Sequence, residues 1–321
     1  MKTQLLIGID LGSSSLKALA LEAASGRTVA LSRMPLQHDR LPGGGCEVGE
    51  PMLRSALSAV LRDVAHQLGR RVADVRAIGC TGHGAGLYAL DARGELAGGR
   101  AVASTDQRAG ARAQSLAASH GPQLLADVGC QPWPGQPTVI AAELLGSDAV
   151  RSGALQRLMF AKDYVGFLLT GQIATDASDA STAGLLSVSS GDWSPLAFSA
   201  SGIAGLGPQA FGPLVRSGEV IGTLQPSEIA KAGLAMASAF VEQTAIIGEI
   251  SSNAQRTAHL TAEVAHTIDD VNSGARLTTE AARQGKPGGD ADKIAPDSRH
   301  DLLEGVDGKD RPTKLHGDIG A

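Results

Sequence analysis

The segment that most constrains the fold lies at the start of the chain. An apolar run, Leu5–Ile9, leads into Asp10, Gly12 and three consecutive hydroxyl residues, Ser13–Ser15, and a second apolar run begins at Leu16. This order predicts a strand, a polar turn and a second strand. A P-loop or a dinucleotide-binding fold would instead continue from the turn into a helix.

The polar turn carries groups that suit the phosphates of a nucleotide. Gly12 lets a ligand approach the backbone, and the turn's N–H groups and the hydroxyls of Ser13, Ser14 and Ser15 can donate hydrogen bonds to phosphate oxygens. Asp10 can hold a hydrated Mg²⁺ ion through water. An ordinary hairpin with a polar turn fits the same residues, so this segment alone leaves both interpretations open.

Composition narrows the class of protein. A length of 321 residues allows one large domain or two of medium size. With a net charge of −5 and a pI near 5.9, nothing draws the whole chain to nucleic acid or to an anionic membrane. No apolar run reaches the ~18 residues of a membrane span, so we expect neither a nucleic-acid nor a membrane partner.

Localisation is expected to be cytoplasmic. The chain enters its first strand directly rather than through a charged and apolar leader. Its three cysteines, Cys46, Cys80 and Cys130, are isolated and lack metal-ligand spacing. Such cysteines are typical of reduced thiols in the cytoplasm.

The expected elements have a mixed α/β order: three strands, a helix, a strand, and then mainly helices. We expect strands at residues 5–9, 16–22, 28–32, 75–80, 87–90 and 101–103, and helices at 51–69, 110–128, 139–145 and 155–169. Residues 173–188 read as short strands and polar loops.

Five separate segments resemble the FGGY carbohydrate kinases, and among them the xylulokinases and L-xylulose kinases. They are residues 8–17, matching the family's phosphate loop; 77–88 and 104–108, matching its two sugar-binding loops; and 161–171 and 174–181. The resemblance implies a ribonuclease-H-like domain over residues 1–234, of the kind shared by actin, Hsp70 and sugar kinases.

The same resemblance implies chemistry. ATP with Mg²⁺ would phosphorylate a hydroxyl of a pentulose-like sugar, either a ketose or a polyol. Asp10 would organise the metal through water, and the residues from Gly12 to Ser15 together with Lys17 would cradle the phosphates.

Three residues in the matched loops are candidates for sugar contacts: His83, Asp106 and Arg108. Short charged groups converging from loops suit a ligand rich in hydroxyls. A structural histidine and a surface Asp–Arg pair remain the alternatives.

Four further polar residues in the matched segments are interpreted as structural. Lys162 and Asp163 lie in a helical pattern and suit a structural hinge pair. Asp176 and Asp179 suit turn caps, with lining of the cleft as the alternative.

The sequence departs from the family in the sugar loops. Xylulokinases carry a Met-His pair where this chain has Gly84 and Ala85, and many members carry Trp where it has Ser104. These departures favour the L-xylulose-kinase-like branch and leave the sugar open.

The family's general base is an aspartate at the start of a second domain, and no counterpart follows residue 234. Gly288-Gly289-Asp290 is superficially similar but lacks a flanking apolar strand. We therefore expect the general base to be absent and this chain to have little or no kinase activity alone, because nothing would accept the proton of the attacking hydroxyl. A non-catalytic sugar-binding or oligomerising remnant and a gene-fusion product are the alternatives.

Beyond residue 234 the sequence changes character. Residues 235–283 predict a long coiled-coil-like helix, because 4-3 spacing of apolar residues runs through 240–283 with polar interruptions. This helix could join two copies of the chain. Residues 242–255 resemble the signalling helix of methyl-accepting chemotaxis proteins. Residues 284–321 are rich in Gly, Asp, Lys and Pro and predict a disordered tail.

Overall fold

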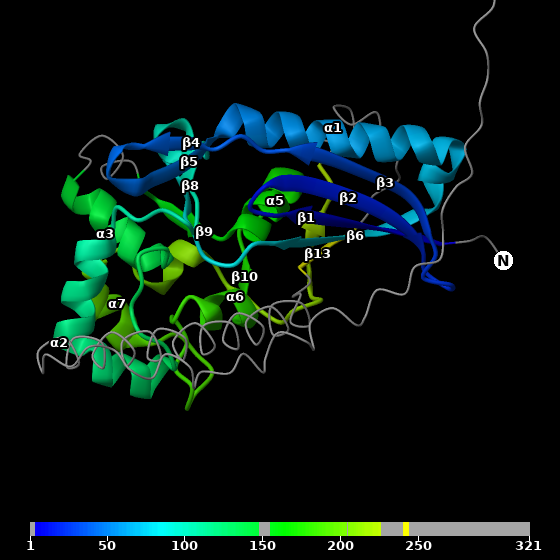
Figure 1. Cartoon of the computed structure of the whole chain (residues 1–321). Coiled ribbons are helices and arrows are strands. Elements are labelled where there is room, and N and C mark those ends of the chain that lie inside the picture. Colours follow the sequence, from blue (N-terminus) through cyan, green and yellow to red (C-terminus); the bar gives the residue numbers. More distant parts are fainter. Residues whose placement is uncertain (1–3, 148–154, 204, 226–239, 244–321) are drawn as a thin grey trace, which may run out of the picture. The chain divides into compact units, whose positions relative to one another are not determined.

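A computed structural model describes residues 4–147, 155–203, 205–225 and 240–243 (Figure 1). All of them belong to one compact unit, Met1–Glu249. The unit is mixed α/β, as the element order predicts. None of the described helices combines the length and apolarity needed to cross a bilayer.

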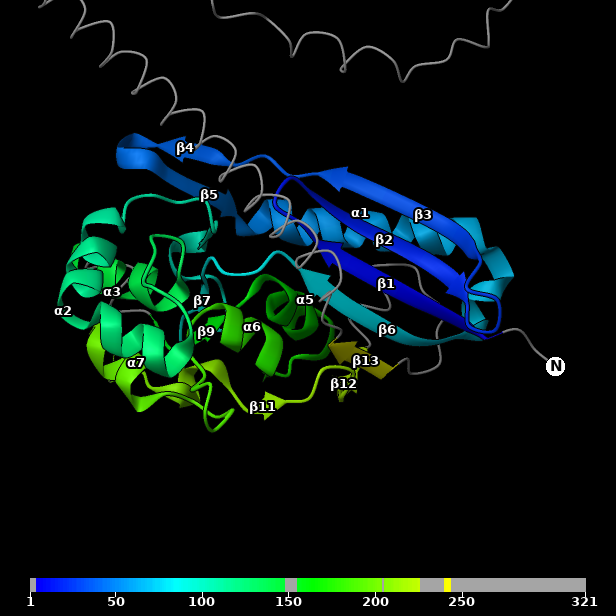
Figure 2. The same ribbon diagram turned by 60° about the horizontal axis from the view of Figure 1, so that its bottom comes forward.

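The described strands build a six-stranded sheet in the order β12-β13-β6-β1-β2-β3 (Figure 2). The bounds are β1 (Leu5–Leu11), β2 (Ser15–Glu22), β3 (Thr28–Pro35), β6 (Val75–Gly82), β12 (Val220–Thr223) and β13 (Phe240–Gln243). Strands β1, β2 and β3 form an antiparallel meander, whereas β6 runs parallel to β1 and β13 runs parallel to β6. The expected strand–turn–strand at the N-terminus is therefore confirmed.

The main core lies between this sheet and helix α1 (Glu50–Leu68), which runs along it in Figure 1. Alternate β1 side chains, from Leu5 to Leu11, are almost fully buried, which is the pattern of a strand with one covered face. Helix α5 (Ala161–Thr170) packs against β6, and the hydroxyl of its Tyr164 donates a hydrogen bond of 3.1 Å to the carboxylate of Glu50 at the start of α1.

A second core gathers the helices α2 (Gly110–Val128), α3 (Pro137–Ser147) and α7 (Pro195–Ser201) around buried aromatic rings. The ring centroid of Phe211 lies 5.7 Å from that of Phe160 and 6.1 Å from that of Phe198. The remaining elements are β4 (Asp39–Leu41), β5 (Gly45–Gly49), β7 (Tyr88–Leu90), β8 (Arg100–Val102), β9 (Arg157–Met159), β10 (Thr175–Asp176), α6 (Ala177–Thr182), β11 (Leu214–Val215) and the 3₁₀ turns Pro42–Gly44, Gly69–Asp74, Ala97–Gly99 and Pro208–Phe211.

Two of the elements expected within residues 155–188 differ from the structure. The helix expected at 155–169 is divided, because Arg157–Met159 pairs with β7 as strand β9 and the helix begins only at Ala161. Backbone pairing with a buried strand decides this short apolar run, whose periodicity fits either state. Residues 173–188, expected as strands and loops, contain the short helix α6, capped by the Asp176 side chain.

The expected helix over 235–283 is wrong at Phe240–Gln243, which form β13 between β12 and β6. The free edge of β6 offers unpaired backbone groups, and pairing them outweighs the weak helical preference of four residues. The rest of that predicted helix and the predicted tail at 284–321 lie outside the described residues.

Gly86 marks a close crossing of the chain, on which the position of the neighbouring loops depends. Its φ is +76°, and a Cβ atom there would lie 2.8 Å from the Val102 carbonyl oxygen and 2.9 Å from the Ser104 nitrogen. Its N–H donates to the Gly135 carbonyl at 3.0 Å. Backbone atoms cannot yield as a flexible side chain would, so only glycine fits.

We predict that Gly86→Ala lowers the free energy of unfolding by more than about 2 kcal/mol, because the methyl group adds a backbone clash to the strain of a positive φ. Urea unfolding followed by circular dichroism measures this. The control is Gly26→Ala, which has a φ of +69° but no atom within 4 Å of the added carbon, so only the strain, about 1 kcal/mol, remains. Equal losses in the two variants would contradict the prediction.

Candidate functional site

The phosphate turn, residues 10–17, brings several of the predicted phosphate and metal groups together. Asp10 and Lys17 face each other across β1 and β2, and Lys17 Nζ lies 3.0 Å from Asp10 Oδ2. Both side chains are partly exposed. A ligand can therefore reach a carboxylate and an ammonium group at once.

Within the turn, Gly12 leaves a space that a side chain would fill. A Cβ atom there would lie 3.2 Å from the Ser15 carbonyl oxygen and 3.7 Å from Asp10 Oδ2. Ser13 and Ser14 are exposed, whereas Ser15 is buried as the first residue of β2. The structure thus places Ser13 and Ser14 where a phosphate could meet them, and Ser15 beneath the surface.

The glycine loop, residues 81–86, lies directly beside the phosphate turn. Strand β6 pairs in parallel with β1 so that Thr81 stands opposite Asp10, and the His83 N–H donates to the Leu11 carbonyl at 2.9 Å. The carboxyl ends of parallel strands meet at one edge of a sheet, which is where ligands bind in many α/β folds.

His83 in the glycine loop turns its ring toward the protein. Its Nε2 lies 3.0 Å from the Tyr88 hydroxyl and its Nδ1 lies 3.4 Å from the Gly84 carbonyl oxygen. Burial lowers the pKa of His83, and Asp10 is close enough to oppose that effect in part. The imidazole is therefore neutral at pH 7, and both of its nitrogens already lie near protein groups.

Asp106 and Arg108 are bonded to each other and to β5. The Asp106 carboxylate is 2% exposed and accepts hydrogen bonds from the N–H groups of Cys46, at 2.7 Å, and Arg108, at 2.9 Å. The Arg108 guanidinium also binds Glu47, at 2.6 Å, and its pKa is raised chiefly by the hydrogen bonds to Asp106. These bonds hold the 104–108 loop against β5 rather than extending to the phosphate turn.

A buried ionic group, here called the lysine cluster, joins the first turns of α5 and α6. It consists of Lys162, Asp163, Asp176 and Asp179. Lys162 Nζ lies 2.7 Å from Asp163, 3.0 Å from Asp179 and 3.5 Å from Asp176. The sequence predicts a hinge pair at Lys162 and Asp163 and separate turn caps at Asp176 and Asp179, because nothing in the spacing shows that one ammonium group serves three carboxylates.

Burial and the neighbouring ammonium group shift the pKa values of the carboxyl groups in this cluster in opposite directions. Burial raises the pKa of Asp179 to about 6, although Lys162 opposes the shift, and it raises the pKa of Asp163 as well. Burial would also raise the pKa of Asp176, but Lys162 and the Ser178 hydroxyl outweigh it and lower that pKa. Three carboxylates around one ammonium group leave a formal surplus of negative charge.

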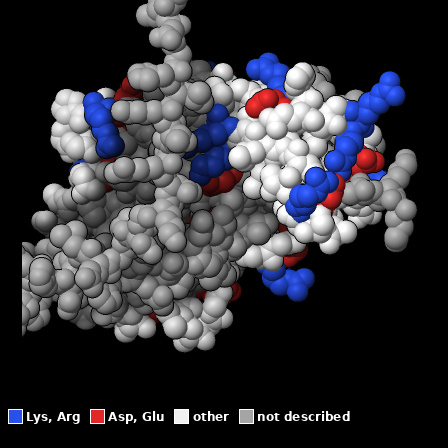
Figure 3. Space-filling view, turned by 45° about the vertical axis from the view of Figure 1, so that its right-hand side comes forward, with Lys and Arg blue, Asp and Glu red and all other residues white. Residues whose placement is uncertain are grey.

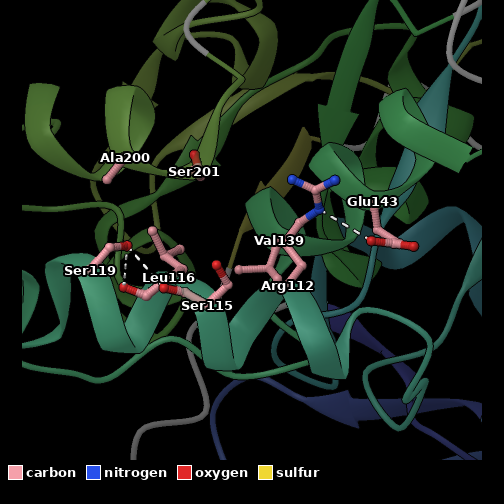
Figure 4. Close-up of a pocket in the computed structure, with 8 residues that line it drawn as sticks. All are labelled: Arg112, Ser115, Leu116, Ser119, Val139, Glu143, Ala200 and Ser201. Atoms are coloured by element: carbon pink, nitrogen blue, oxygen red, sulfur yellow. Dashed lines mark hydrogen bonds and ion pairs between the residues drawn. The ribbon is translucent and has the colours of Figure 1, made fainter.

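A cavity of about 350 Å³ lies elsewhere, among α2, α3 and α7 (Figure 4). Its charged groups are Arg112 and Glu143, paired at 3.1 Å, and serine side chains such as Ser115 line it as well. None of its lining residues belongs to the phosphate turn, the glycine loop or the lysine cluster. It is a cavity of the second core and takes no part in the candidate site.

The described surface drawn in Figure 3 mixes charges of both signs. Lys and Arg side chains lie beside Asp and Glu side chains, with uncharged residues between such groups. The described part of this face therefore has no extended patch of one sign.

A comparison with protein-family models matches residues 5–261 to the N-terminal domain of the FGGY family of carbohydrate kinases. The match extends past residue 234, the boundary expected from the sequence, and includes 242–255, whose resemblance to a chemoreceptor helix finds no support in these comparisons.

Curated relatives are sugar kinases. L-xylulose/3-keto-L-gulonate kinase of Escherichia coli (strain K12) is 29% identical over 233 residues, covering 72% of this chain and 46% of the relative. Xylulose kinase of Streptomyces rubiginosus is 30% identical over 235 residues, covering 70% and 45%. The chain spans about half the length of the curated relatives it matches.

Solved structures confirm the fold. Xylulose kinase from Rhodospirillum rubrum matches with a TM-score of 0.67 at 21% identity, covering 75% of this chain and 49% of that one. Plasmodium falciparum glycerol kinase with ADP matches with a TM-score of 0.66 at 14% identity, covering 75% and 48%. The expected ribonuclease-H-like sugar kinase fold is therefore correct.

We predict that the stability of the chain falls as pH rises through the titration of Asp179. Its pKa of about 6 lies above the unfolded value near 3.8, so the folded state holds the proton more tightly. The stabilisation is complete below about pH 4 and is lost as pH rises through 6, by up to about 3 kcal/mol.

Asp179→Asn removes this dependence, because an amide does not titrate. Urea unfolding at pH 4.5 and 7.5 should show the variant gaining stability relative to the wild type at the higher pH. Asp192→Asn, which neutralises an exposed carboxylate, is the control for the loss of one charge. A stability difference that stays the same at both pH values would refute the assignment.

Proposed function

The chain belongs to the FGGY family of carbohydrate kinases, and from this premise we propose that it binds MgATP and a pentulose-like sugar for transfer of the γ-phosphoryl group to a sugar hydroxyl. The observation that carries the proposal is the pairing of β1 with β6. It sets the phosphate turn beside the glycine loop, so that phosphates and sugar would meet at one edge of the sheet.

Asp10 fits a magnesium ion that is shared with phosphates. The described residues contain no group of three His, Cys, Asp or Glu side chains that could hold a metal alone. One partly exposed carboxylate suits Mg²⁺, which keeps several waters and takes its other ligands from phosphate oxygens. Bound there, the ion would neutralise charge on the transferring phosphoryl group.

The phosphates would lie against the turn itself. The space above Gly12 admits a phosphate oxygen close to the backbone, and the exposed hydroxyls of Ser13 and Ser14 can donate to it. Lys17 would leave the Asp10 carboxylate for the phosphates, since their charge is greater. Ser15, which is buried, would support the turn from beneath.

The sugar would lie against the glycine loop. His83 is neutral at pH 7, and its position suits it to shaping the loop through Tyr88. Asp106 and Arg108 would act chiefly by holding the neighbouring loop, because their groups are already paired. The names of the two curated relatives described above include neutral pentuloses and a keto sugar acid.

We expect Asp10→Asn to abolish the magnesium dependence of nucleotide binding and to weaken MgATP binding about tenfold or more, because an amide holds the hydrated ion poorly. Calorimetric titration of the 321-residue chain with ATP, with and without Mg²⁺, measures this. Asp192→Asn serves as the charge-matched control at an exposed position. Unchanged magnesium dependence in Asp10→Asn would remove Asp10 from the site.

We further expect the 321-residue chain to bind without rapid turnover. The family match is to an N-terminal domain, and the resemblance places the proton-accepting aspartate in a second domain. Without that group the attacking hydroxyl keeps its proton. An assay of ADP release with ATP and a panel of ketoses should stay at background, and robust turnover would disprove this part of the proposal.

A further inference from the structure

We propose that Asp179 contacts the substrate directly: its Oδ1 accepts a hydrogen bond from a hydroxyl of a neutral polyhydroxy sugar beside Gly84, and the surplus negative charge of the lysine cluster selects against sugar acids. The inference rests on the proposed function and narrows its substrate class.

The first observation is that Asp179 has unused acceptor capacity. The residue is 8% exposed, and its described partner is Lys162, 3.0 Å from Oδ2. Asp176, by contrast, accepts from the Ser178 N–H and hydroxyl, the Asp179 N–H and the Ser217 hydroxyl. A carboxylate offers about four acceptor sites, so Asp179 retains capacity for a ligand.

The second observation is the direction of the free oxygen. A Cβ atom placed on Gly84 would lie 3.9 Å from Asp179 Oδ1 and 3.7 Å from the Thr182 methyl group. Gly84 itself places no side-chain atom beside Asp179 Oδ1, and a Cβ atom there would be in ordinary van der Waals contact with both groups. The free oxygen therefore faces the loop that the proposed function assigns to the sugar.

The third observation is electrostatic. Lys162 is 3% exposed and already lies within 3.5 Å of three carboxylates, so it has no free position for a ligand anion. A sugar carboxylate near Gly84 would meet surplus negative charge and be repelled, whereas a hydroxyl can donate to Asp179 in a charge-assisted bond. Asp179 would thus favour neutral ketoses over keto acids.

The test is calorimetric titration of the 321-residue chain at pH 8 with a neutral ketopentose and with a keto sugar acid. We expect the wild type to bind the neutral sugar at least about tenfold more tightly. Asp179→Asn should weaken neutral-sugar binding about tenfold and narrow the preference over the acid, because the amide keeps the shape but not the charge.

Gly84→Leu provides an independent variant that leaves the lysine cluster intact. Its side chain would fill the space beside Asp179 Oδ1 and should weaken neutral-sugar binding at least about tenfold, as overfilling of a packed site does. Asp192→Asn, an exposed carboxylate neutralised in the same way, should retain wild-type affinity and preference.

Magnesium-dependent ATP binding, measured on the same samples, distinguishes a failure of the proposed function from a failure of the inference about Asp179. A wild type that binds neither ATP nor sugar overturns the proposed function and the inference with it. Three outcomes overturn the inference alone. In the first the wild type binds ATP but no sugar, and in the second it binds the acid as tightly as the ketose. The third outcome is an Asp179→Asn variant whose sugar affinity and preference are unchanged. A purely structural role for Asp179 would leave the ketose-to-acid ratio unchanged.

Discussion

The parallel pairing of β1 with β6 is the constraint on which the candidate site depends. The two strands come from segments separated by the whole of α1, and their register sets Asp10 opposite Thr81. The His83 N–H then extends the pairing by one more bond, to the Leu11 carbonyl. A shift of β1 by one residue against β6 would turn Asp10 to the other face of the sheet and away from its place opposite Thr81. The buried alternation along β1 fixes the register, so the core specifies the site.

The lysine cluster is the second constraint, and burying its charges costs free energy of desolvation. A buried ion pair recovers little net stability, because its desolvation opposes the Coulomb attraction. This cluster also contains three carboxylates and only one ammonium group, and the pKa of the buried Asp179 is raised. Asp176 is tied to the Ser217 hydroxyl, so the cluster connects α5 and α6 with the chain leading to β12.

Local patterns predict the elements better than the contacts between them. The strand–turn–strand at the N-terminus follows from Asp10, Gly12 and the apolar runs on either side, and α2 has the predicted bounds. Strands β9 and β13 are missed, because edges offered by distant segments decide them. Motifs place Asp10 and Lys17 together, but they cannot show that Ser15 is buried or that Lys162 joins three acids. Those facts depend on packing between segments far apart in sequence.

Strand β13 has a consequence for how the domain can be divided. It lies between β12 and β6, so β12 reaches the rest of the sheet through a strand that follows it in the chain. A fragment ending at residue 234 would lose that inner strand, free the outer edge of β6 and leave β12 without a partner in the sheet. Exposed strand edges recruit other chains. A fragment prepared for expression should therefore end beyond Gln243. Aggregation of a shorter fragment would result from the lost strand β13 rather than from low stability of the domain itself.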